Sequence, residues 1–423
     1  MGSKRIALLT VGTRGDVQPF AALGLGLKSA GYEVLLAAPA NFRSWIERLG
    51  LAYAEGMGDF RDFMADPRVK RIIDSGPLSN LGQKFSLGRE FYEKTARKAF
   101  AAAEHADAII FHPKMSFAID IAEARRVPII MAALQPFTST RAFPFLAITR
   151  HSLGGTLNKA TYAILRATRL SLAGVENKLR EELLDLPPVS RFSNHMNLNG
   201  QPIPVIYGFS KHVQPRPHDW PAQVHIAGYW FLQDPNAVSW QPNDELARFL
   251  ASGKPPIYIG FGSMPVSCPT KVAGLLAKSL EETDLRAVIA RGWGGLGEAD
   301  ILSDRVHLID SAPHQHLFPH MAGVVHHGGA GTTAAGLRAG RPTLVCPFMV
   351  DQPYWGGRIE ALGAGPAPLH IKHWRDDRMS DALHALTTNT DYRTGALAVA
   401  QLLQSEDGVA RAVELVKTIV GNP

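Results

Sequence analysis

The sequence predicts an α/β protein with two doubly wound, Rossmann-like domains whose parallel sheets face each other across a cleft. Three observations support this fold class. A strand–loop–helix–strand unit opens the chain, a second series of such units begins near residue 255, and a polar, proline-marked stretch separates them. Strands that alternate with helices form parallel sheets covered on both faces. A length of 423 residues also favours two domains.

The first unit begins with the apolar run Arg5 to Val11, which predicts a buried strand. A turn over Gly12 to Gly15 follows, and apolar residues from Val17 to Ala30 recur at helical spacing. Gly31 stands where a helix C-cap belongs, and Tyr32 to Ala37 is the next strand. This order is that of a βαβ unit, which feeds a parallel sheet.

The same order recurs in the second half of the chain. Residues 256–261 predict a strand and residues 270–283 a helix, and further strands are expected at 286–291, 305–310, 323–327 and 343–348. Segment 233–254 is interpreted as a linker. The expected domains are therefore residues 1–232 and 255–423, with the last helix able to pack back on the first domain.

Residues 142–184 predict helices that do not fit this alternation. Basic side chains stud the segment: Arg150, His151, Lys159, Arg166, Arg169, Lys178 and Arg180. Two interpretations stay open, namely solvated helix faces or a basic surface near an acceptor entrance or an anionic membrane.

Composition excludes several classes of protein. Hydrophobic residues make up 46% and charged residues 19%, as in ordinary globular proteins. The apolar runs are too short for a membrane helix, and no secretory signal is present. Two cysteines, Cys268 and Cys346, make no disulfide framework and favour a reducing cytoplasm. The net charge of +6 suits an anionic partner, but no basic run interleaved with aromatics indicates nucleic acid.

The loops that follow strands are the candidate site, because ligands of open parallel sheets bind beyond the strands' carboxyl ends. The densest such loop runs from His326 to Thr333, where a glycine-rich turn leads into a helix. Glycines allow close approach of a ligand, and a helix N-terminus offers free N–H groups. The loop therefore predicts a pyrophosphate site. A metal site among the histidines from His314 to His327 is disfavoured, because no carboxylate or cysteine completes the set.

Two further loops carry acids at strand ends. Asp351 and Gln352 can together bind vicinal hydroxyls, or they can cap the helix expected at residues 353–362. Asp16 is either a functional carboxylate or simply the cap of the first helix.

These motifs resemble a known family. Residues 325–333, 339–343, 347–348 and 351–352 resemble the donor-binding signature of UDP-glycosyltransferases of the GT-B fold. Residues 12–19, 258–264 and 292–296 resemble the sterol 3-β-glucosyltransferase branch, and glycopeptide-antibiotic glycosyltransferases share much of the pattern.

The resemblance implies an inverting, metal-independent enzyme that moves a sugar, glucose from UDP-glucose, to a hydroxyl of a sterol or related apolar acceptor. The UDP-sugar would be a co-substrate with no other cofactor, and the location would be cytoplasmic, with peripheral membrane contact left open.

The resemblance also implies roles for single residues. His327 would contact the donor diphosphate, and Asp351 with Gln352 would hold the sugar hydroxyls. Asp16 would be the catalytic base, with His112 as its partner or as a contact of the acceptor hydroxyl. The other implied donor-binding residues are Gly15, Gly262, Ser263, Trp293, Ala312, Gly329, Gly331, Thr332 and Thr333. The aromatics expected at the acceptor are Phe85, Phe137 and Phe143.

Three positions depart from the plant form of the signature. Ser311 replaces the tryptophan that stacks on uracil, so Trp293 is expected to take that role. Ala335 replaces a ribose-binding glutamate, and Asp16 fills the position of the plant histidine base. The alternatives that stay open are a TDP-deoxysugar transferase of antibiotic biosynthesis, a non-catalytic nucleotide-sugar-binding protein and a UDP-sugar epimerase.

Overall fold

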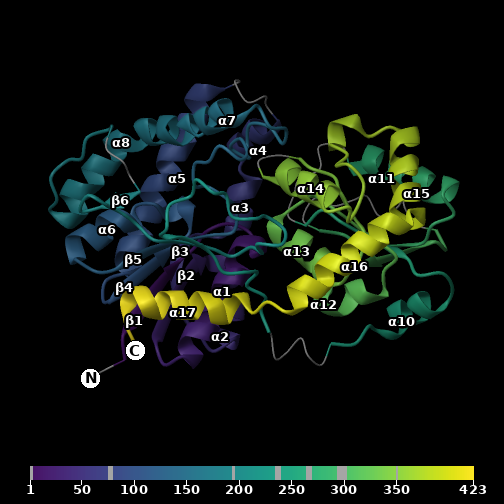
Figure 1. The fold of residues 1–423 in the computed structure, drawn as a ribbon, viewed down its shortest axis with the longest axis horizontal. Helices are drawn as coiled ribbons and strands as arrows, with labels where there is room; N and C mark the ends of the chain where they lie inside the picture. The colour runs from purple at the N-terminus through teal and green to yellow at the C-terminus, as the bar shows by residue number, and fades with distance from the viewer. Residues whose placement is uncertain are drawn as a thin grey trace.

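The computed structural model describes residues 3–74, 80–192, 196–233, 240–262, 269–292, 303–348 and 351–423. Two parallel sheets with helices packed around them organise the chain, as Figure 1 shows. This architecture confirms the predicted α/β fold class. We call the part built on the first sheet the N-terminal domain and the part built on the second the C-terminal domain.

The first sheet has seven strands in the order β3-β2-β1-β4-β5-β8-β9, and all its neighbouring strands run parallel. The strands are β1 (Arg5–Leu9), β2 (Glu33–Pro39), β3 (Ala52–Met57), β4 (Ala108–Phe111), β5 (Ile129–Ala133), β8 (Val205–Tyr207) and β9 (Val224–Ile226). Strands β4 and β5 are buried along their whole length, which is why they read as continuous apolar runs.

The second sheet has five parallel strands in the order β12-β11-β10-β13-β14. They are β10 (Ile257–Gly260), β11 (Ala287–Ala290), β12 (Val306–Ile309), β13 (Val324–His326) and β14 (Thr343–Val345). Each strand that the sequence predicts in this half is present. A short antiparallel pair, β6 (Asn197–Leu198) and β7 (Gln201–Pro202), lies outside both sheets.

The helices of the N-terminal domain are α1 (Arg14–Ser29), α2 (Arg43–Arg48), α3 (Phe60–Ala65), α4 (Pro67–Asp74), α5 (Leu81–Ala102), α6 (Ala118–Arg125), α7 (Gly155–Thr161) and α8 (Ala163–Leu184). The later helices are α10 (Asp244–Ala251), α11 (Pro269–Glu282), α12 (His314–Leu317), α13 (Ala330–Arg338), α14 (Gln352–Ala361), α15 (Asp376–Thr388), α16 (Thr390–Gln404) and α17 (Gly408–Val420). Within the described residues, no helix has both the length and the apolarity needed to cross a bilayer.

Strand order reverses once in each sheet, and these two places position the site. The chain adds β2 and β3 on one side of β1 and then crosses to add β4 on the other side. It repeats the move at β10 and β13. Loops that leave two adjacent strands in opposite directions open a gap at the strands' carboxyl ends, where doubly wound proteins bind ligands. We call these two places the reversal points.

Three predicted segments differ from the structure. Helix α1 begins at Arg14 rather than Val17, because Thr13 and Asp16 form a capping box at its start. Residues 142–154 form no helix, since the side chain of Asn158 bonds their backbone at both ends and Pro144 disfavours helical geometry before it. Helix α10 lies inside the segment expected to be a linker.

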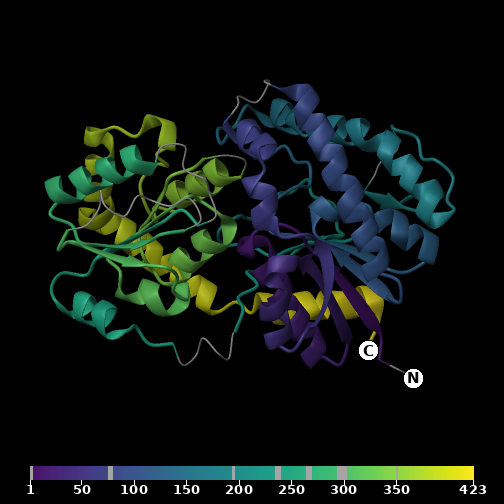
Figure 2. The same ribbon diagram turned by 180° about the vertical axis from the view of Figure 1, so that it is seen from behind.

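The last helix returns to the first domain. Figures 1 and 2 show α17 lying along the N-terminal domain, where it packs against α1. Val409 of α17 lies against Gly26, and the Tyr32 hydroxyl donates a hydrogen bond to the carbonyl of Gly421 at 2.6 Å.

The segment with which the chain leaves the N-terminal domain and the start of α17, with which it returns, lie side by side. A methyl group added at Gly408 would lie 2.4 Å from the carbonyl oxygen of Tyr229, just before the first passage. A methyl group at Gly228, where φ is +103°, would lie 3.1 Å from the Gly408 Cα. Glycine is required at both positions for this close approach.

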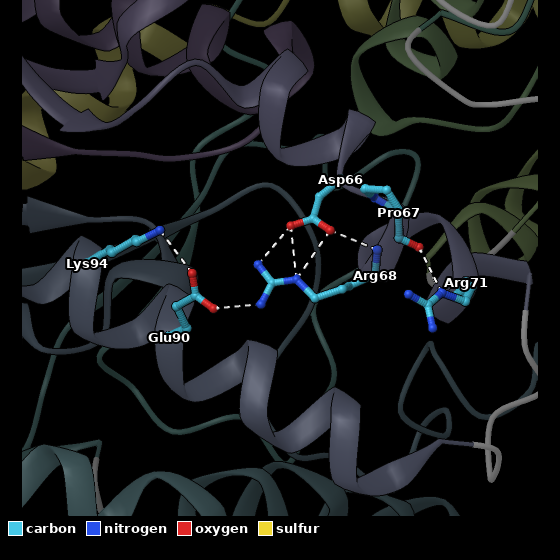
Figure 3. A network of polar contacts seen from close by, with 6 residues as sticks. All are labelled: Asp66, Pro67, Arg68, Arg71, Glu90 and Lys94. Atoms are coloured by element: carbon cyan, nitrogen blue, oxygen red, sulfur yellow. Dashed lines mark hydrogen bonds and ion pairs between the residues drawn. The ribbon is translucent and has the colours of Figure 1, made fainter.

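Exposed ion pairs join the short helix α4 to α5, as Figure 3 shows. The Arg68 guanidinium lies 2.8 Å from the Asp66 carboxylate and 3.1 Å from that of Glu90, which Lys94 also contacts at 3.0 Å. Exposed pairs of this kind contribute no more than about 1 kcal/mol each. The network therefore orients α4 on α5 and adds little to overall stability.

Candidate active site

Asp16 lies at the reversal point of the N-terminal sheet, in the first turn of α1. Its Oδ2 accepts a hydrogen bond from the backbone N–H of Thr13 at 2.8 Å, which caps the helix. Gly12 has a φ of +134°, and a methyl group there would lie 2.2 Å from Asp16 Oδ2. Only glycine leaves room for the carboxylate at this position. Asp16 is thus not the N-cap that the sequence suggests, since Thr13 takes that position, but the third helical residue of a capping box, which fixes the direction of its carboxylate.

His112 directly follows β4, the strand beside β1, and its ring lies next to the Asp16 carboxylate. Its Nε2 is 3.6 Å from Asp16 Oδ1, while its Nδ1 accepts a hydrogen bond from the backbone N–H of Lys114 at 3.2 Å. The ring proton therefore sits on Nε2 and faces the carboxylate. Burial and the charge of Lys114 lower the pKa of His112 to about 3, so the ring is neutral at physiological pH. With 1% of its surface exposed, His112 lies against Asp16 and offers almost no surface to a ligand.

Sequence reasoning misses a third group here, Lys114. Its Nζ lies 3.0 Å from Asp16 Oδ1. Burial raises the pKa of Asp16, but the charge of Lys114, the neighbouring His112 ring and the hydrogen bonds from Lys114 and Thr13 outweigh it and hold that pKa below its usual value. Asp16 is therefore ionised at neutral pH. The available signal was position, because Lys114 follows a predicted strand at the same edge of the sheet as Asp16.

The second reversal point holds the histidine–glycine loop. His326 ends β13, is fully buried and accepts a hydrogen bond from the backbone N–H of Gly328 at its Nδ1, at 2.9 Å. The ring of His327 lies against Gly329, where an added methyl group would be 2.6 Å from its Nε2. Burial lowers the pKa of His327 to about 4, so this ring is neutral as well. Its Nδ1 is buried and has no hydrogen-bond partner within the described part of the chain.

Helix α13 begins directly after this loop, with Gly329 at its N-cap and no side chain bonded to its first N–H groups. Those groups and the positive end of the helix dipole suit an anionic ligand. Gly331 is exposed and Thr332 partly exposed on the first turn. Thr333 is buried, and its hydroxyl bonds no other group that the structure describes.

Three more of the residues implied as donor-binding line the same region. Gly15 lies in the first turn of α1, Gly262 follows β10 with a φ of +59°, and Ala312 is half-buried before α12. Ser263 and Trp293 lie outside the described residues.

Contacts from the start of α1 reach the second domain. Burial and the charge of Arg14 lower the pKa of His314 to about 4, so Arg14 lies close to the start of α12. Helix α1 also contacts α13 directly.

Asp351 links the two reversal points. Its Oδ2 accepts a hydrogen bond from Trp355 Nε1 at 3.1 Å, and its carboxylate also bonds the side chain of Gln135, which follows β5 in the other domain. Burial, aided by the negative charge of Asp16, raises the pKa of Asp351. Two carboxylates, one from each domain, therefore lie close enough to repel each other. Gln135 is a second residue that sequence reasoning misses.

Gln352 begins α14 and holds the loop before it. Its Oε1 accepts a hydrogen bond from the backbone N–H of Phe348 at 2.7 Å. Asp351 occupies the N-cap position but does not cap the helix with its side chain. The carboxylate is instead directed toward the other domain.

The aromatics expected at the acceptor are not all brought together. Phe143 packs on Tyr354 of α14 with ring centroids 5.5 Å apart, and Phe137 packs on Phe145 at 6.1 Å. Both pairs lie in the core cluster that the two domains share. Phe85 is 44% exposed on α5, and no ring contact joins it to the others in the described ranges.

Within those ranges, no group of three or more His, Cys, Asp or Glu side chains is arranged to hold a metal ion.

Comparison with known proteins places this geometry in a family. Residues 6–144 match the glycosyltransferase family 28 N-terminal domain, and residues 275–419 match the C-terminal domain of erythromycin biosynthesis protein CIII-like proteins. The sterol 3-beta-glucosyltransferase UGT80B1 of Arabidopsis thaliana is 37% identical over 97% of this chain and 67% of its own length. The chain belongs to the sterol 3-β-glucosyltransferase family. This confirms the resemblance drawn from the motifs.

Members of the sterol 3-β-glucosyltransferase family differ in length. The sterol 3-beta-glucosyltransferase of Yarrowia lipolytica is 36% identical over 97% of this chain, and this chain covers 28% of its length. This chain covers 64% of the length of the sterol 3-beta-glucosyltransferase UGT80A2 of Arabidopsis thaliana. Solved structures share the fold over the whole chain. The glycosyltransferase of kitacinnamycin has a TM-score of 0.72 at 16% identity, with 100% of both chains covered. The calicheamicin glycosyltransferase CalG4 has a TM-score of 0.69 at 19% identity, with 100% of this chain and 99% of that chain covered. These likenesses confirm the GT-B fold.

Proposed function

We propose that this member of the sterol 3-β-glucosyltransferase family transfers glucose from UDP-glucose to the hydroxyl of a sterol or a similarly apolar alcohol, with inversion and without metal. The observation that carries the proposal is the meeting of the two reversal points. An ionised carboxylate, Asp16, lies there beside a second carboxylate and near an uncapped helix N-terminus. The curated relatives are named for the sterol reaction. The antibiotic transferases share 20% identity or less and support only the fold.

The proposed reaction is a single displacement. The acceptor oxygen forms a bond to the anomeric carbon, the bond from that carbon to the phosphate oxygen breaks, and the acceptor proton passes to Asp16. Thr13 donates two hydrogen bonds to Oδ2 and Lys114 donates one to Oδ1. His112 Nε2, at 3.6 Å from Oδ1, is too far to form a hydrogen bond, so one of the carboxylate's about four acceptor positions stays open on Oδ1 for the hydroxyl. The charge that develops on UDP is stabilised by the first N–H groups of α13 and by His327.

The deciding experiment measures UDP release from UDP-glucose with and without a panel of sterols. Release that needs a sterol and yields a glucoside supports the proposal. Release of TDP from TDP-deoxysugars, with no release of UDP from UDP-glucose, would favour antibiotic-type transfer. Conversion of UDP-glucose to an epimer without acceptor would indicate an epimerase, and tight UDP-glucose binding without turnover would indicate a non-catalytic binding protein.

His327→Ala should weaken binding of UDP. The neutral ring has a buried Nδ1 without a partner in the described residues, and a hydrogen bond from a neutral group to a charged ligand is worth about 1.5–3 kcal/mol. That range corresponds to about a 10- to 150-fold rise in Kd for UDP by titration calorimetry. His320→Ala, an exposed histidine of the same segment, serves as the control and should bind UDP as the wild type does. Equal affinities for both variants would remove His327 from the diphosphate site.

Asp351→Asn should change which sugar is transferred more than how tightly UDP binds. The carboxylate lies beside Asp16, where the sugar would sit, and Asn keeps an acceptor for Trp355 while removing the charge. We expect the ratio of kcat/KM for UDP-glucose over UDP-galactose to fall about tenfold, since one hydrogen bond is worth roughly 1 kcal/mol or more. A variant that loses UDP affinity but keeps this ratio would contradict the assignment.

Lys114→Met should move the acid limb of the pH–rate profile upward. Activity is lost as pH falls through the pKa of the base, and Lys114 holds the pKa of Asp16 below its usual value. In the wild type, kcat/KM should therefore stay level down to about pH 5. Without the Lys114 charge, burial dominates, the pKa rises and an acid limb enters the measured range. Lys114→Arg, which keeps the charge, should keep the wild-type profile, and a Met variant with that profile would show that Lys114 does not act on the base.

A further inference from the structure

The exposed apolar side chains of this protein are concentrated in one segment. Most of the large hydrophobic residues that lie exposed in the described chain fall between residues 148 and 170: Ile148, Leu153, Leu157, Ile164, Leu165 and Leu170. Leu157 is the most exposed of them, at 60%. A patch of this kind on a single chain marks a binding surface rather than a core.

Helices α7 and α8 present residues 155–170 of this segment as one continuous surface, while Ile148 and Leu153 lie in the loop before α7. Tyr162, which joins them, has φ −70° and ψ −9°, so the helices run almost end to end. Leu157 and Ile164 are seven residues apart and therefore lie on the same side. The small exposed residues Ala160, Ala163 and Ala167 cover the outward face of the helices, between the two apolar side chains and the basic residues Lys159 and Arg166.

The charge of the segment is one-sided. No Asp or Glu occurs between Glu123 and Glu176, whereas Lys159 and Arg166 are exposed and also seven residues apart. They border the exposed face of the helices on one side, and Leu157 and Ile164 border it on the other side. Lys159 interacts electrostatically with Asp219, but that carboxylate is already bonded to the Thr140 hydroxyl and the Arg141 backbone.

Arg169 and Arg180 face inward, and Lys178 is exposed but lies beside an acid of α5, so these three residues do not belong to this surface. Arg180 is buried against Asp120 and Glu123, Arg169 pairs with Glu176 at 3.5 Å, and Lys178 lies 3.7 Å from Glu93. The structure thus separates a structural half of the basic segment from an exposed half.

The exposed half adjoins the proposed acceptor side. Arg150 forms an ion pair with Glu360 of α14 at 2.6 Å, and Phe143 packs on the same helix. In Figure 1, α7 is the end of the α7–α8 pair that is nearer the C-terminal domain. An apolar acceptor that arrives over α7 would therefore reach the domain boundary directly.

We propose that α7 and the first turns of α8 dock on the surface of an anionic phospholipid bilayer, with Leu157 and Ile164 entering the headgroup region and Lys159 and Arg166 contacting phosphates. Interfacial helices combine an apolar strip with basic flanks in this way. The part of this proposal that concerns delivery of the acceptor rests on the proposed function. The docking itself does not.

The test is sedimentation with vesicles of phosphatidylcholine alone and of phosphatidylcholine mixed equally with phosphatidylglycerol. The full chain should bind the mixed vesicles and bind the neutral ones more weakly. Leu157→Gln/Ile164→Gln should weaken binding to both about tenfold or more, because apolar area is lost. Lys159→Gln/Arg166→Gln should lose about thirtyfold on mixed vesicles only, since each basic residue near an anionic surface is worth roughly a factor of five.

Leu397→Gln/Leu402→Gln is the matched control, because these two leucines are equally exposed but lie on α16. It should bind vesicles as the wild type does. No vesicle binding by the wild type, or equal loss in the control, would overturn the docking surface. So would a wild-type dimer that Leu157→Gln/Ile164→Gln dissociates, because the face would then join two copies of the chain.

Turnover of a sterol dissolved in detergent separates this proposal from the proposed function. All three variants should keep wild-type turnover in that assay. A wild type that binds vesicles but never transfers glucose would leave the docking surface standing and remove the proposed function.

Discussion

Asp16→Asn is expected to fold and bind UDP as the wild type does, yet to transfer glucose about 10²- to 10⁴-fold more slowly. The amide keeps an oxygen that can accept the Thr13 N–H, so the start of α1 is preserved. It cannot take a proton from the acceptor, and it carries no charge for Lys114 to hold. Initial rates with UDP-glucose and a sterol, together with UDP titration, measure both parts of this result.

Asp62→Asn provides the control, because Asp62 is also an acid in the first turn of a helix but is exposed and lies in α3. Its turnover should equal that of the wild type. If Asp16→Asn kept near-wild-type turnover, Asp16 would be a helix cap and nothing more. If it lost UDP binding as well, its effect would be on the site as a whole and not on proton transfer.

Arg180→Met should lower the free energy of unfolding by about 3–5 kcal/mol. Arg180 is buried, contacts the carboxylates of Asp120 and Glu123, and donates from Nε to the carbonyl of Pro187 at 2.9 Å. Burial and the neighbouring Glu176 already raise the pKa of Asp120. Removing the guanidinium leaves that carboxyl buried without its compensating charge, so the folded state loses more than the packing of one side chain. Urea unfolding measures the change.

Arg68→Met is the matched control, since Arg68 also contacts two carboxylates but at the surface, in the network of Figure 3. Arg68→Met should lower the free energy of unfolding by no more than about 1 kcal/mol. Adding Asp120→Asn to Arg180→Met should restore part of the lost stability, because the uncompensated charge is then removed. Equal losses for Arg180→Met and Arg68→Met would show that burial of the pair contributes nothing.

The sequence is sufficient for the fold and for the edge of each sheet where the site lies. Short apolar runs such as Ala108–Phe111 become buried parallel strands, and residues that directly follow them reach the carboxyl edge without further information. Asp16, His327 and Asp351 are found in this way, whereas His112 is reached only through the family resemblance. The positions of the first three follow from local pattern and sheet topology alone.

Other parts of the site depend on contacts between distant residues. Lys114 and Gln135 carry no local motif, and their importance appears only when Asp16 and Asp351 come within reach of them. Residues 142–154 are expected to be helical, yet the Asn158 side chain holds them as a loop by bonding the backbone of Arg141 before the segment and of Leu153 at its end. The basic segment likewise divides into inner and outer parts only when its acidic partners are in place.

The paired glycines Gly228 and Gly408 have a mechanical consequence. Because both positions need glycine, the segment that leaves the N-terminal domain and the segment that returns to it are held at backbone-contact distance. A side chain at either position would push these two segments apart and displace the start of α17 from its place beside α1. The two ends of the C-terminal domain are therefore anchored to the N-terminal domain at a single point.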